Sequence, residues 1–217
     1  MTVYVSLSGG MDSTALVAVV RGEEPLVGVS FHYGQRHAKE LSAAAAVAAH
    51  YGIEHRVVEL PRLSSPALTD GGPVPHGHYA AETMALTVVQ GRNLLFLSTL
   101  VGLTEPGDKV AIGVHSGDHA IYADCRPEFI TLVRQAVAAA YDVDVLAPFL
   151  SKTKDEIAKT GALLGAPFHL SWSCYEGGDI HCGRCGTCVE RAEAFHLAHV
   201  TDPTAYKDSN YWREVTA

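Results

Sequence analysis

Basic residues are scarce in this chain of 217 residues, which has 16 Lys and Arg against 24 Asp and Glu and a formal net charge of −8. Proteins that bind duplex DNA or structured RNA normally carry a basic surface that neutralises phosphates. The acidic balance therefore disfavours a direct nucleic-acid partner. A small anionic ligand is compatible with it, because a few backbone N–H groups can bind an anion against the net charge.

Long apolar runs and an export signal are also missing. The strongly apolar stretches 15–20 and 94–97 are far shorter than the roughly 20 residues of a membrane-spanning helix. The first ten residues, MTVYVSLSGG, have no basic segment and soon reach glycine, unlike a secretory signal. We therefore expect a cytoplasmic protein without a membrane partner, in which the five cysteines form no disulfides.

Segments of strand type and helix type alternate along most of the chain. Runs of β-branched and aromatic residues predict strands at 2–7, 26–31, 55–60, 109–114 and 143–146. Apolar residues at helical spacing, with caps and glycine stops, predict helices at 12–21, 38–51, 94–103, 127–141, 153–164 and 189–199. Residues 61–82 contain four prolines and predict a loop. This alternation predicts an α/β fold with a doubly wound parallel sheet.

A glycine-rich segment, Ser8-Gly9-Gly10-Met11-Asp12-Ser13, joins the first predicted strand to the first helix. Adjacent glycines let backbone N–H groups point outward, and the helix adds the positive end of its dipole. A plain glycine turn with a capping Asp12 is the alternative, but the whole motif at the first strand-to-helix turn favours a phosphate or pyrophosphate site. Asp12 could also bind Mg²⁺. The predicted nucleotide-binding residues are Leu7, Ser8, Gly9, Gly10, Met11, Asp12, Ser13 and Thr14.

Four cysteines crowd into a short C-terminal segment with the spacing C-x7-C-x2-C-x2-C. Thiolates two residues apart can bind one tetrahedral ion, and Gly183 and Gly186 permit the tight turns between them. Four thiolates with no open position predict structural Zn²⁺, with an iron–sulfur cluster as the alternative. Cys125 lies far away in the sequence and is either a small core residue or part of a pocket wall. The predicted ligands are Cys174, Cys182, Cys185 and Cys188.

Polar clusters follow several predicted strands and open several predicted helices. The carboxyl ends of parallel strands meet at one edge of a sheet, so these loops together predict an active site there, although any one residue could be a solvated loop residue. Arg92 and Lys152 are candidates to bind phosphate or carboxylate and, with Asp12, to act in catalysis. Asp124 is a candidate acceptor for the N–H edge of a guanine-like base. The predicted substrate-binding residues are Tyr33, Gln35, Arg36, Arg92, Asn93, His115, Asp118, Asp124 and Arg126.

The chain contains, in this order, SGGMDST, FHYGQRHAKEL, GRNLLFLS, GDHAIYADCRPEF, TKDEI and SCY…HCGRCGTCVER. The first of these resembles the PP-loop of the ATP pyrophosphatase superfamily, which has the adenine nucleotide alpha hydrolase-like fold. The combination resembles the 7-cyano-7-deazaguanine synthases and covers about residues 3–195. We divide the chain into a PP-loop catalytic domain at 1–165 and a zinc-binding C-terminal region at 166–217.

The resemblance implies an ATP-dependent carbon–nitrogen ligase of queuosine or deazapurine biosynthesis. Its substrates would be 7-carboxy-7-deazaguanine, ammonia and ATP. The carboxylate is adenylated, ammonia displaces AMP to give an amide, and a second activation gives the nitrile. The family uses Mg²⁺ with ATP and one zinc ion per chain, and it often forms homodimers.

Three alternatives stay open from the sequence. A relative that stops at the amide would keep the same motifs, and this chain departs from the common family pattern at Gln90 and in HSGDHAIYADCR. A PP-loop enzyme that modifies tRNA belongs to the same superfamily but fits the acidic balance less well. A non-catalytic, zinc-bound nucleotide sensor would not require the intact PP-loop together with the polar loops.

Overall fold

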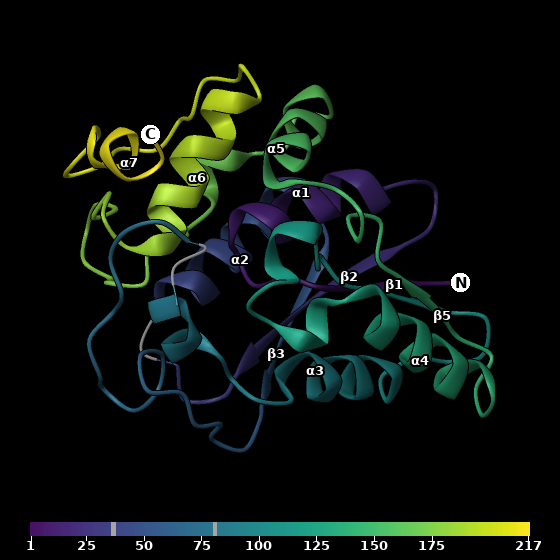
Figure 1. The fold of residues 1–217 in the computed structure, drawn as a ribbon. Helices are drawn as coiled ribbons and strands as arrows, with labels where there is room; N and C mark the ends of the chain where they lie inside the picture. The colour runs from purple at the N-terminus through teal and green to yellow at the C-terminus, as the bar shows by residue number, and fades with distance from the viewer. Residues whose placement is uncertain (36–37, 80–81) are drawn as a thin grey trace.

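The computed structural model describes residues 1–35, 38–79 and 82–217 (Figure 1). Within these residues, five parallel strands form one sheet in the order β3-β2-β1-β4-β5. The predicted α/β fold with a parallel sheet is therefore confirmed. The strands are β1 (Val3–Ser6), β2 (Leu26–His32), β3 (Glu54–Glu59), β4 (Lys109–Ala111) and β5 (Asp144–Leu146).

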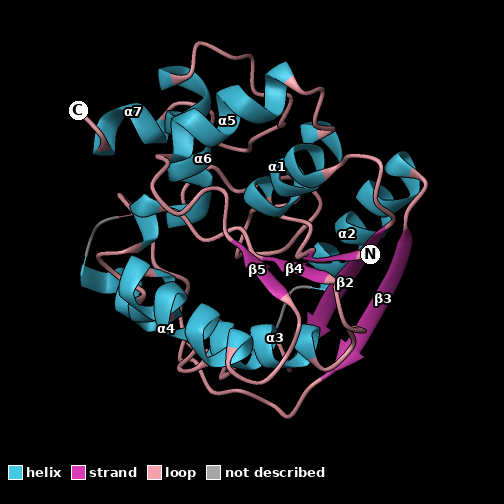
Figure 2. Ribbon diagram, turned by 90° about the vertical axis from the view of Figure 1, so that its right-hand side faces the viewer, coloured by secondary structure: helices cyan, strands magenta, loops and turns pink. Residues whose placement is uncertain are grey.

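Helices cover both faces of the sheet, which is the doubly wound arrangement. In Figures 1 and 2 the helices α1, α2, α5 and α6 lie on one side of the strands, and α3 and α4 lie on the other. No helix in the described part of the chain is both long and apolar enough to cross a membrane. The α-helices are α1 (Met11–Val20), α2 (Ala38–Tyr51), α3 (Arg92–Val101), α4 (Pro127–Ala138), α5 (Lys154–Leu163), α6 (Gly186–Leu197) and α7 (Tyr211–Val215).

The central strand β1 is apolar on both sides because both sides are covered. Successive side chains of a strand point to opposite faces of a sheet. Val3 and Val5 accordingly pack in the core beneath α1, whereas Tyr4 packs in the core that includes residues of α3 and α4. Both valines are almost completely buried.

The position of β1 in the sheet leaves a crevice at one edge of the sheet. β1 lies between β2 and β4, so the chain runs outward from β1 in one direction and returns at β4 to continue in the other. Loops that leave the carboxyl ends of β1 and β4 therefore diverge and leave a crevice, where parallel α/β sheets bind their ligands. The loop that follows β1 is the predicted nucleotide-binding segment.

Several helix boundaries differ from the prediction for identifiable reasons. Helix α3 begins two residues early, because the Asp124 carboxylate accepts the backbone N–H of Asn93 at 3.0 Å and caps the helix. Helix α6 begins three residues early, directly after Cys185. The short helix α7 was not predicted. Helix α5 opens with a capping box, in which the Glu156 carboxylate accepts the N–H of Thr153 at 2.9 Å.

The C-terminal region packs on the same core as the sheet. Phe168, Ala194 and Phe195 belong to the apolar cluster that contains β1 and α1. The buried Arg191 guanidinium donates to the Ser171 hydroxyl at 2.7 Å and to the Phe168 carbonyl at 3.1 Å, which joins α6 to the chain before the cysteines. The domain boundary at residue 165 stays a prediction.

The contact of α1 with α5 gives a test of this packing. A Cβ on Gly161 would lie 2.5 Å from Phe168 Cζ and 3.0 Å from Ala15 Cβ. Alanine favours a helix over glycine by up to about 1 kcal/mol, but overpacking a core costs about 1–3 kcal/mol. We expect Gly161→Ala to lower the free energy of unfolding in urea by about 1–2 kcal/mol. Gly22→Ala is the control, because a Cβ there meets nothing within 4 Å. An increase in stability at Gly161 would contradict this packing.

Candidate active site

The turn after β1 requires glycine at its second position. Gly9 has φ +85°, and a Cβ there would lie 2.2 Å from the backbone carbonyl oxygen of Glu40 on α2. The carbonyl of Gly9 accepts the N–H of Trp172 at 2.8 Å. The turn is thus held between α2 and the segment that leads to the cysteines.

Hydrogen-bond donors gather around the N-terminus of α1. The Ser8 hydroxyl accepts the N–H of Gly10 at 3.2 Å, and the Ser13 hydroxyl accepts the N–H of Gly9 at 3.1 Å. The N-cap residue of α1 is Gly10, so no side chain covers the end of the helix. Orphan N–H groups, hydroxyls and a helix dipole at one place form an anion-binding site.

Lys154 joins three helices beside this turn. Its Nζ lies 2.7 Å from Oδ2 of Asp12 on α1 and 3.1 Å from Oε2 of Glu190 on α6. Burial opposes ionisation of Asp12, but Lys154 and His115 outweigh it and lower the pKa of Asp12. Burial raises the pKa of Glu190, against the attraction of Lys154. The ionised form is therefore favoured at Asp12 and disfavoured at Glu190, relative to the ordinary pKa of each carboxyl.

His115 and Asp118 extend the charged cluster. His115 is 1% exposed, and its Nε2 lies 3.3 Å from Lys154 Nζ and 3.4 Å from Asp118 Oδ2. The other Asp118 oxygen accepts the hydroxyl of Tyr79 at 3.3 Å. Asp12 Oδ1 is buried and has no hydrogen-bond partner among the described residues. A buried carboxylate oxygen without a partner is a candidate ligand for a cation.

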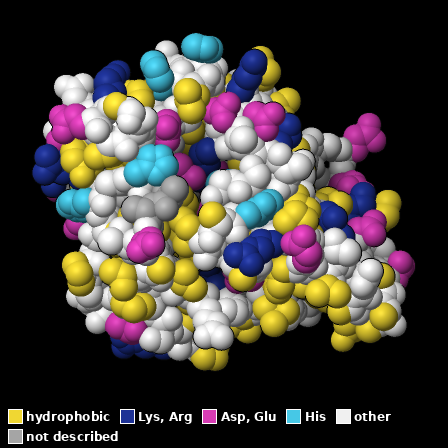
Figure 3. Space-filling view, viewed as in Figure 1, with side chains coloured by type: hydrophobic (Ala, Val, Ile, Leu, Met, Phe, Trp, Pro, Cys, Tyr) yellow, Lys and Arg dark blue, Asp and Glu magenta, His cyan; other side chains and the backbone are white. Residues whose placement is uncertain are grey.

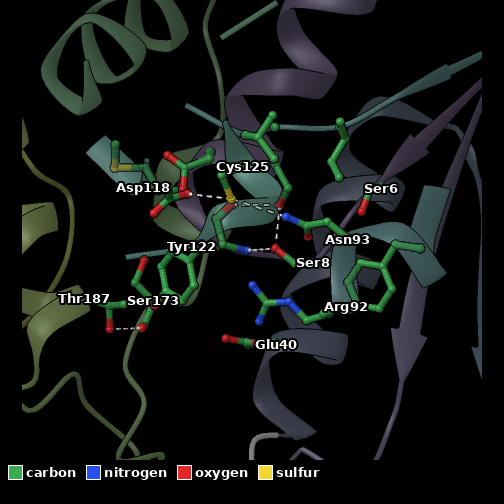
Figure 4. Close-up of a pocket in the computed structure, with 18 of the residues that line it drawn as sticks. Ser6, Ser8, Glu40, Arg92, Asn93, Asp118, Tyr122, Cys125, Ser173 and Thr187 are labelled. Carbon is green, nitrogen blue, oxygen red and sulfur yellow. Dashed lines mark hydrogen bonds between the residues drawn. The ribbon is translucent and has the colours of Figure 1, made fainter. Parts of the chain in front are cut away.

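Except for His115, these groups line a cavity of about 220 Å³ at the edge of the sheet. Figure 4 shows residues from several loops and helices around it, among them Arg92, Glu40, Asp118 and Ser8. Burial alone would lower the pKa of Arg92, but the neighbours Tyr33, Tyr175 and Tyr122 raise it well above its usual value. The guanidinium therefore stays charged inside the cavity. On the face drawn in Figure 3, acidic and basic side chains are interspersed, without a patch of one sign.

The cavity brings together most of the predicted site residues that the structure describes. From the nucleotide-binding and substrate-binding predictions, it is lined by Leu7, Ser8, Gly10, Met11, Asp12, Ser13, Tyr33, Gln35, Arg92, Asn93 and Asp118. Gly9 and Thr14 support the turn instead, with the Thr14 hydroxyl donating to the Gly10 carbonyl at 2.8 Å. Arg36 lies outside the described residues.

Three substrate-binding predictions fall on residues that do not line the cavity. Asp124 is occupied as the cap of α3. Arg126 is exposed, and its Nε donates to the His119 carbonyl at 2.8 Å. His115 lies behind the cavity wall and reaches it through Lys154 and Asp118.

The lysine at the cavity is Lys154, two residues after the predicted Lys152. The cavity is lined by Lys154 and not by Lys152 in the part of the chain that the structure describes. The backbone carbonyl of Lys152 accepts both the N–H and the hydroxyl of Ser116, which fixes the chain before the N-cap Thr153. The following helix then begins with Lys154, whose side chain reaches Asp12.

Two acidic cavity residues, Glu40 and Glu190, were missed. Both lie in quoted motifs, in AKEL and CVER, but neither stands after a predicted strand, where polar loops were sought. Burial raises the pKa of Glu40 to about 7, against the attraction of Arg92. A carboxyl whose folded-state pKa is raised stabilises the fold at acidic pH, and this contribution is lost as the pH rises through about 7.

The four cysteines form one cluster. Their Sγ atoms all lie within 4.8 Å of one another, and all four are free thiols. The Sγ atoms of Cys174 and Cys182 accept backbone N–H groups at 3.2–3.3 Å. His181 packs against Trp172, and its Nε2 accepts the N–H of Ser173. The cluster can hold one tetrahedral ion without a fifth ligand.

The cysteine cluster also supports the cavity wall. Thr187 lies between two of the cysteines, and its hydroxyl donates to the Ser173 carbonyl at 2.6 Å (Figure 4). Glu190 follows two residues after Cys188 on α6. The first turns of α6, which carry Cys188, therefore also carry residues that face the cavity.

The two lysines provide a matched test of the charged cluster. Lys154→Met leaves Asp12 and Glu190 without their cation, and breaking a buried ion pair from one side is strongly destabilising. We expect the free energy of unfolding in urea at pH 7.5 to fall by about 2–4 kcal/mol. Lys152→Met should change it by less than about 0.5 kcal/mol. Equal effects of the two substitutions would contradict the assignment of Lys154.

The sequence matches, over residues 2–199, the family described as Queuosine biosynthesis protein QueC. It is 48% identical over 228 residues to the 7-cyano-7-deazaguanine synthase of Allorhizobium ampelinum, covering 100% of this chain and 97% of that protein. It is also 48% identical over 227 residues to the synthase of the same name from Brucella ovis, covering 100% and 98%.

Among solved structures, the chain is similar to NMN synthetase from Francisella tularensis, with a TM-score of 0.46 and 13% identity over 98% of this chain and 83% of that one. A likeness of this size does not bear on function. The sequence matches span nearly the whole chain and nearly the whole length of the relatives. This chain therefore belongs to the QueC family of queuosine biosynthesis proteins.

Proposed function

We propose that this chain uses ATP to convert 7-carboxy-7-deazaguanine and ammonia into 7-cyano-7-deazaguanine. Membership of the QueC family supports the reaction, since the relatives reported above are named 7-cyano-7-deazaguanine synthase. The observation that carries the proposal is the ion pair of Asp12 with Lys154 beside the open N-terminus of α1, in the same cavity as Arg92. Such a site can bind a polyphosphate beside an anionic substrate.

The first step activates the substrate carboxylate. A carboxylate oxygen attacks the α-phosphorus of ATP, the bond between the α-phosphorus and the bridging oxygen breaks, and pyrophosphate leaves. The N–H groups and hydroxyls of Ser8–Ser13 would stabilise the charge on the leaving pyrophosphate, together with the end of α1. Lys154 would stabilise the negative charge on the oxygens of the reacting α-phosphate. This is the phosphate-binding role that the sequence predicted for Lys152.

Ammonia then forms the carbon–nitrogen bond. Its nitrogen attacks the acyl carbon, AMP leaves with the former carboxylate oxygen, and the nitrogen loses a proton to give the amide. In the second cycle the amide oxygen attacks a second ATP at the α-phosphorus and pyrophosphate leaves again. The carbon–oxygen bond then breaks, AMP leaves, and the nitrogen loses its remaining protons as the nitrile forms.

The cavity must hold the amide between the two cycles. We propose that Tyr33, Gln35, Asn93 and Asp118, which line the cavity, position the base, and that Arg92 binds the anionic carboxylate. Arg36 is proposed as a substrate-binding residue from the sequence alone. Asp124 and Arg126 are proposed to shape the loop rather than contact the substrate, since one caps α3 and the other is exposed.

Two metals accompany the proposal. Mg²⁺ would be held with ATP by Asp12, whose Oδ1 lacks a partner among the described residues, and would neutralise phosphate charge. Zn²⁺ would be held by Cys174, Cys182, Cys185 and Cys188 and would stabilise the start of α6, which carries Thr187 and Glu190. We also propose a homodimer, on the family resemblance.

Mass spectrometry of the reaction over time tests the product. With 7-carboxy-7-deazaguanine, ammonium, Mg²⁺ and excess ATP, we expect the amide to rise and then decay into the nitrile, with two ATP consumed for each nitrile. Asp12→Asn should slow both phases by at least roughly 100-fold. The exposed Asp142→Asn is the matched control and should leave them unchanged.

Two results of this time course would contradict the proposal. An amide that accumulates while ATP is still in excess would identify an amide synthase. Of the sequence differences that raise this alternative, Gln90 is exposed and does not line the cavity, whereas Asp118 and Tyr122 in the second segment do. Turnover of tRNA in place of the free base would identify a tRNA-modifying enzyme.

Elemental analysis tests the metal. We expect one zinc per chain in the purified protein, and loss of that zinc with a lower melting temperature in Cys182→Ser, because three thiolates hold the ion less tightly. Cys125→Ser should keep the zinc, since Cys125 lies outside the cluster. Iron in the cluster, or folded and active protein without metal, would refute the zinc assignment.

A further inference from the structure

Glu40 and Arg92 face one another across the cavity from different helices. Glu40 lies in the first turn of α2, and Arg92 is the first residue of α3. Figure 4 shows the Glu40 side chain below the Arg92 guanidinium at the same cavity. They attract electrostatically, but no hydrogen bond or ion pair joins them among the residues that the structure describes. The space between them can admit a ligand.

Glu40 is held rigidly relative to the anion-binding turn. The backbone carbonyl of Glu40 lies where a Cβ of Gly9 would be, so the first turn of α2 packs directly on the turn. The backbone from which the Glu40 side chain extends is therefore fixed relative to the turn. A group that must place one end of a substrate while the other end reacts needs such a fixed position.

The cavity carboxylates differ in what already occupies them. Asp12 and Glu190 contact Lys154, and Asp118 contacts Tyr79 and His115. The described residues provide no hydrogen-bond donor to the Glu40 carboxylate, although it lies beside a cation. Glu40 is half-buried and lines the cavity, so its carboxylate is open to the donors of a ligand.

The surroundings of Glu40 suit a flat ring. Tyr33, Phe96 and Tyr175 line the same cavity, and the Tyr33 and Phe96 rings lie 5.7 Å apart between centroids. A carboxylate can accept two adjacent N–H groups, and a guanidinium can donate to an anion or carbonyl oxygen. The pair is thus complementary to a base that carries a ring N–H and an exocyclic amine on one edge and oxygen acceptors elsewhere.

We propose that Glu40 accepts the ring N–H and the exocyclic amine of the base and thereby selects an aminopyrimidinone-type ring as substrate. This inference rests on the proposed function and adds the residue that determines base specificity. It gives Glu40 the part that the sequence suggested for Asp124. The role is recognition of the far end of the substrate, away from the reacting carboxylate.

The test compares two bases in two proteins. The bases are 7-carboxy-7-deazaguanine and the same compound without its exocyclic amine, and the proteins are the wild type and Glu40→Gln. A hydrogen bond to a charged group contributes roughly 1.5–3 kcal/mol, so we expect the wild type to prefer the amine-bearing base by roughly 10- to 100-fold in kcat/KM. In Glu40→Gln most of this preference should vanish through a higher KM for the base, with the KM for ATP unchanged.

Two further variants serve as controls for position and for stability. The exposed Glu128→Gln on α4 should keep the wild-type preference. Asp124→Asn should lower stability, because it weakens the cap of α3, but should also keep the preference. Glu40→Gln should fold, and its melting temperature at pH 8 should be no lower than that of the wild type, since burial disfavours the Glu40 charge above its pKa of about 7.

The outcomes separate this inference from the proposed function. An unchanged preference in Glu40→Gln, a rise only in the KM for ATP, or loss of the preference in Asp124→Asn would overturn the role of Glu40. If the wild type turns over neither base, the proposed function fails. Calorimetric binding of the two bases without ATP then still decides the inference, because Glu40→Gln should remove the difference in their affinities.

Discussion

The arrangement of the cavity depends on the ion pairs that the ammonium group of Lys154 makes. It pairs with Asp12 at the start of α1 and with Glu190 on α6, while Lys154 itself begins α5. The helix after the anion-binding turn, helix α5 and the helix that follows the cysteines therefore meet at one cation. Because one of the two carboxylates is ionised and the pKa of the other is raised, a change of charge in the cavity acts on all three helices. A bound polyphosphate would enter this balance directly.

The alternation of strands and helices was sufficient to predict the parallel sheet and the position of the turn after β1. That turn is local: it needs Gly9, Gly10 and the start of a helix, all adjacent in the sequence. The cysteine cluster is equally local, because only two residues separate each of its last three members from the next. Short-range patterns of this kind carry their geometry with them, so the sequence could predict them.

The remainder of the site depends on contacts between distant segments. Lys152 and Lys154 are equivalent in sequence, and only the N-cap at Thr153 decides which of them reaches Asp12, 142 residues away. The carboxylate of Asp124, a predicted acceptor for a base, accepts the N–H of Asn93 in the first turn of α3, which lies 31 residues away in the sequence. Glu40 and Glu190 face the cavity from helices, where the sequence gives no sign that one exposed-looking acid differs from another. Tertiary packing, rather than residue type, assigns these roles.

The chemistry proposed for this cavity is attack of a substrate carboxylate oxygen on the α-phosphorus of ATP beside Asp12 and Lys154. Labelling both carboxylate oxygens of 7-carboxy-7-deazaguanine with ¹⁸O measures this step. We expect both AMP molecules formed per nitrile to carry one ¹⁸O and the pyrophosphate to carry none, because each AMP leaves with an oxygen of the original carboxylate. Label in pyrophosphate or in inorganic phosphate, or unlabelled AMP, would contradict this mechanism.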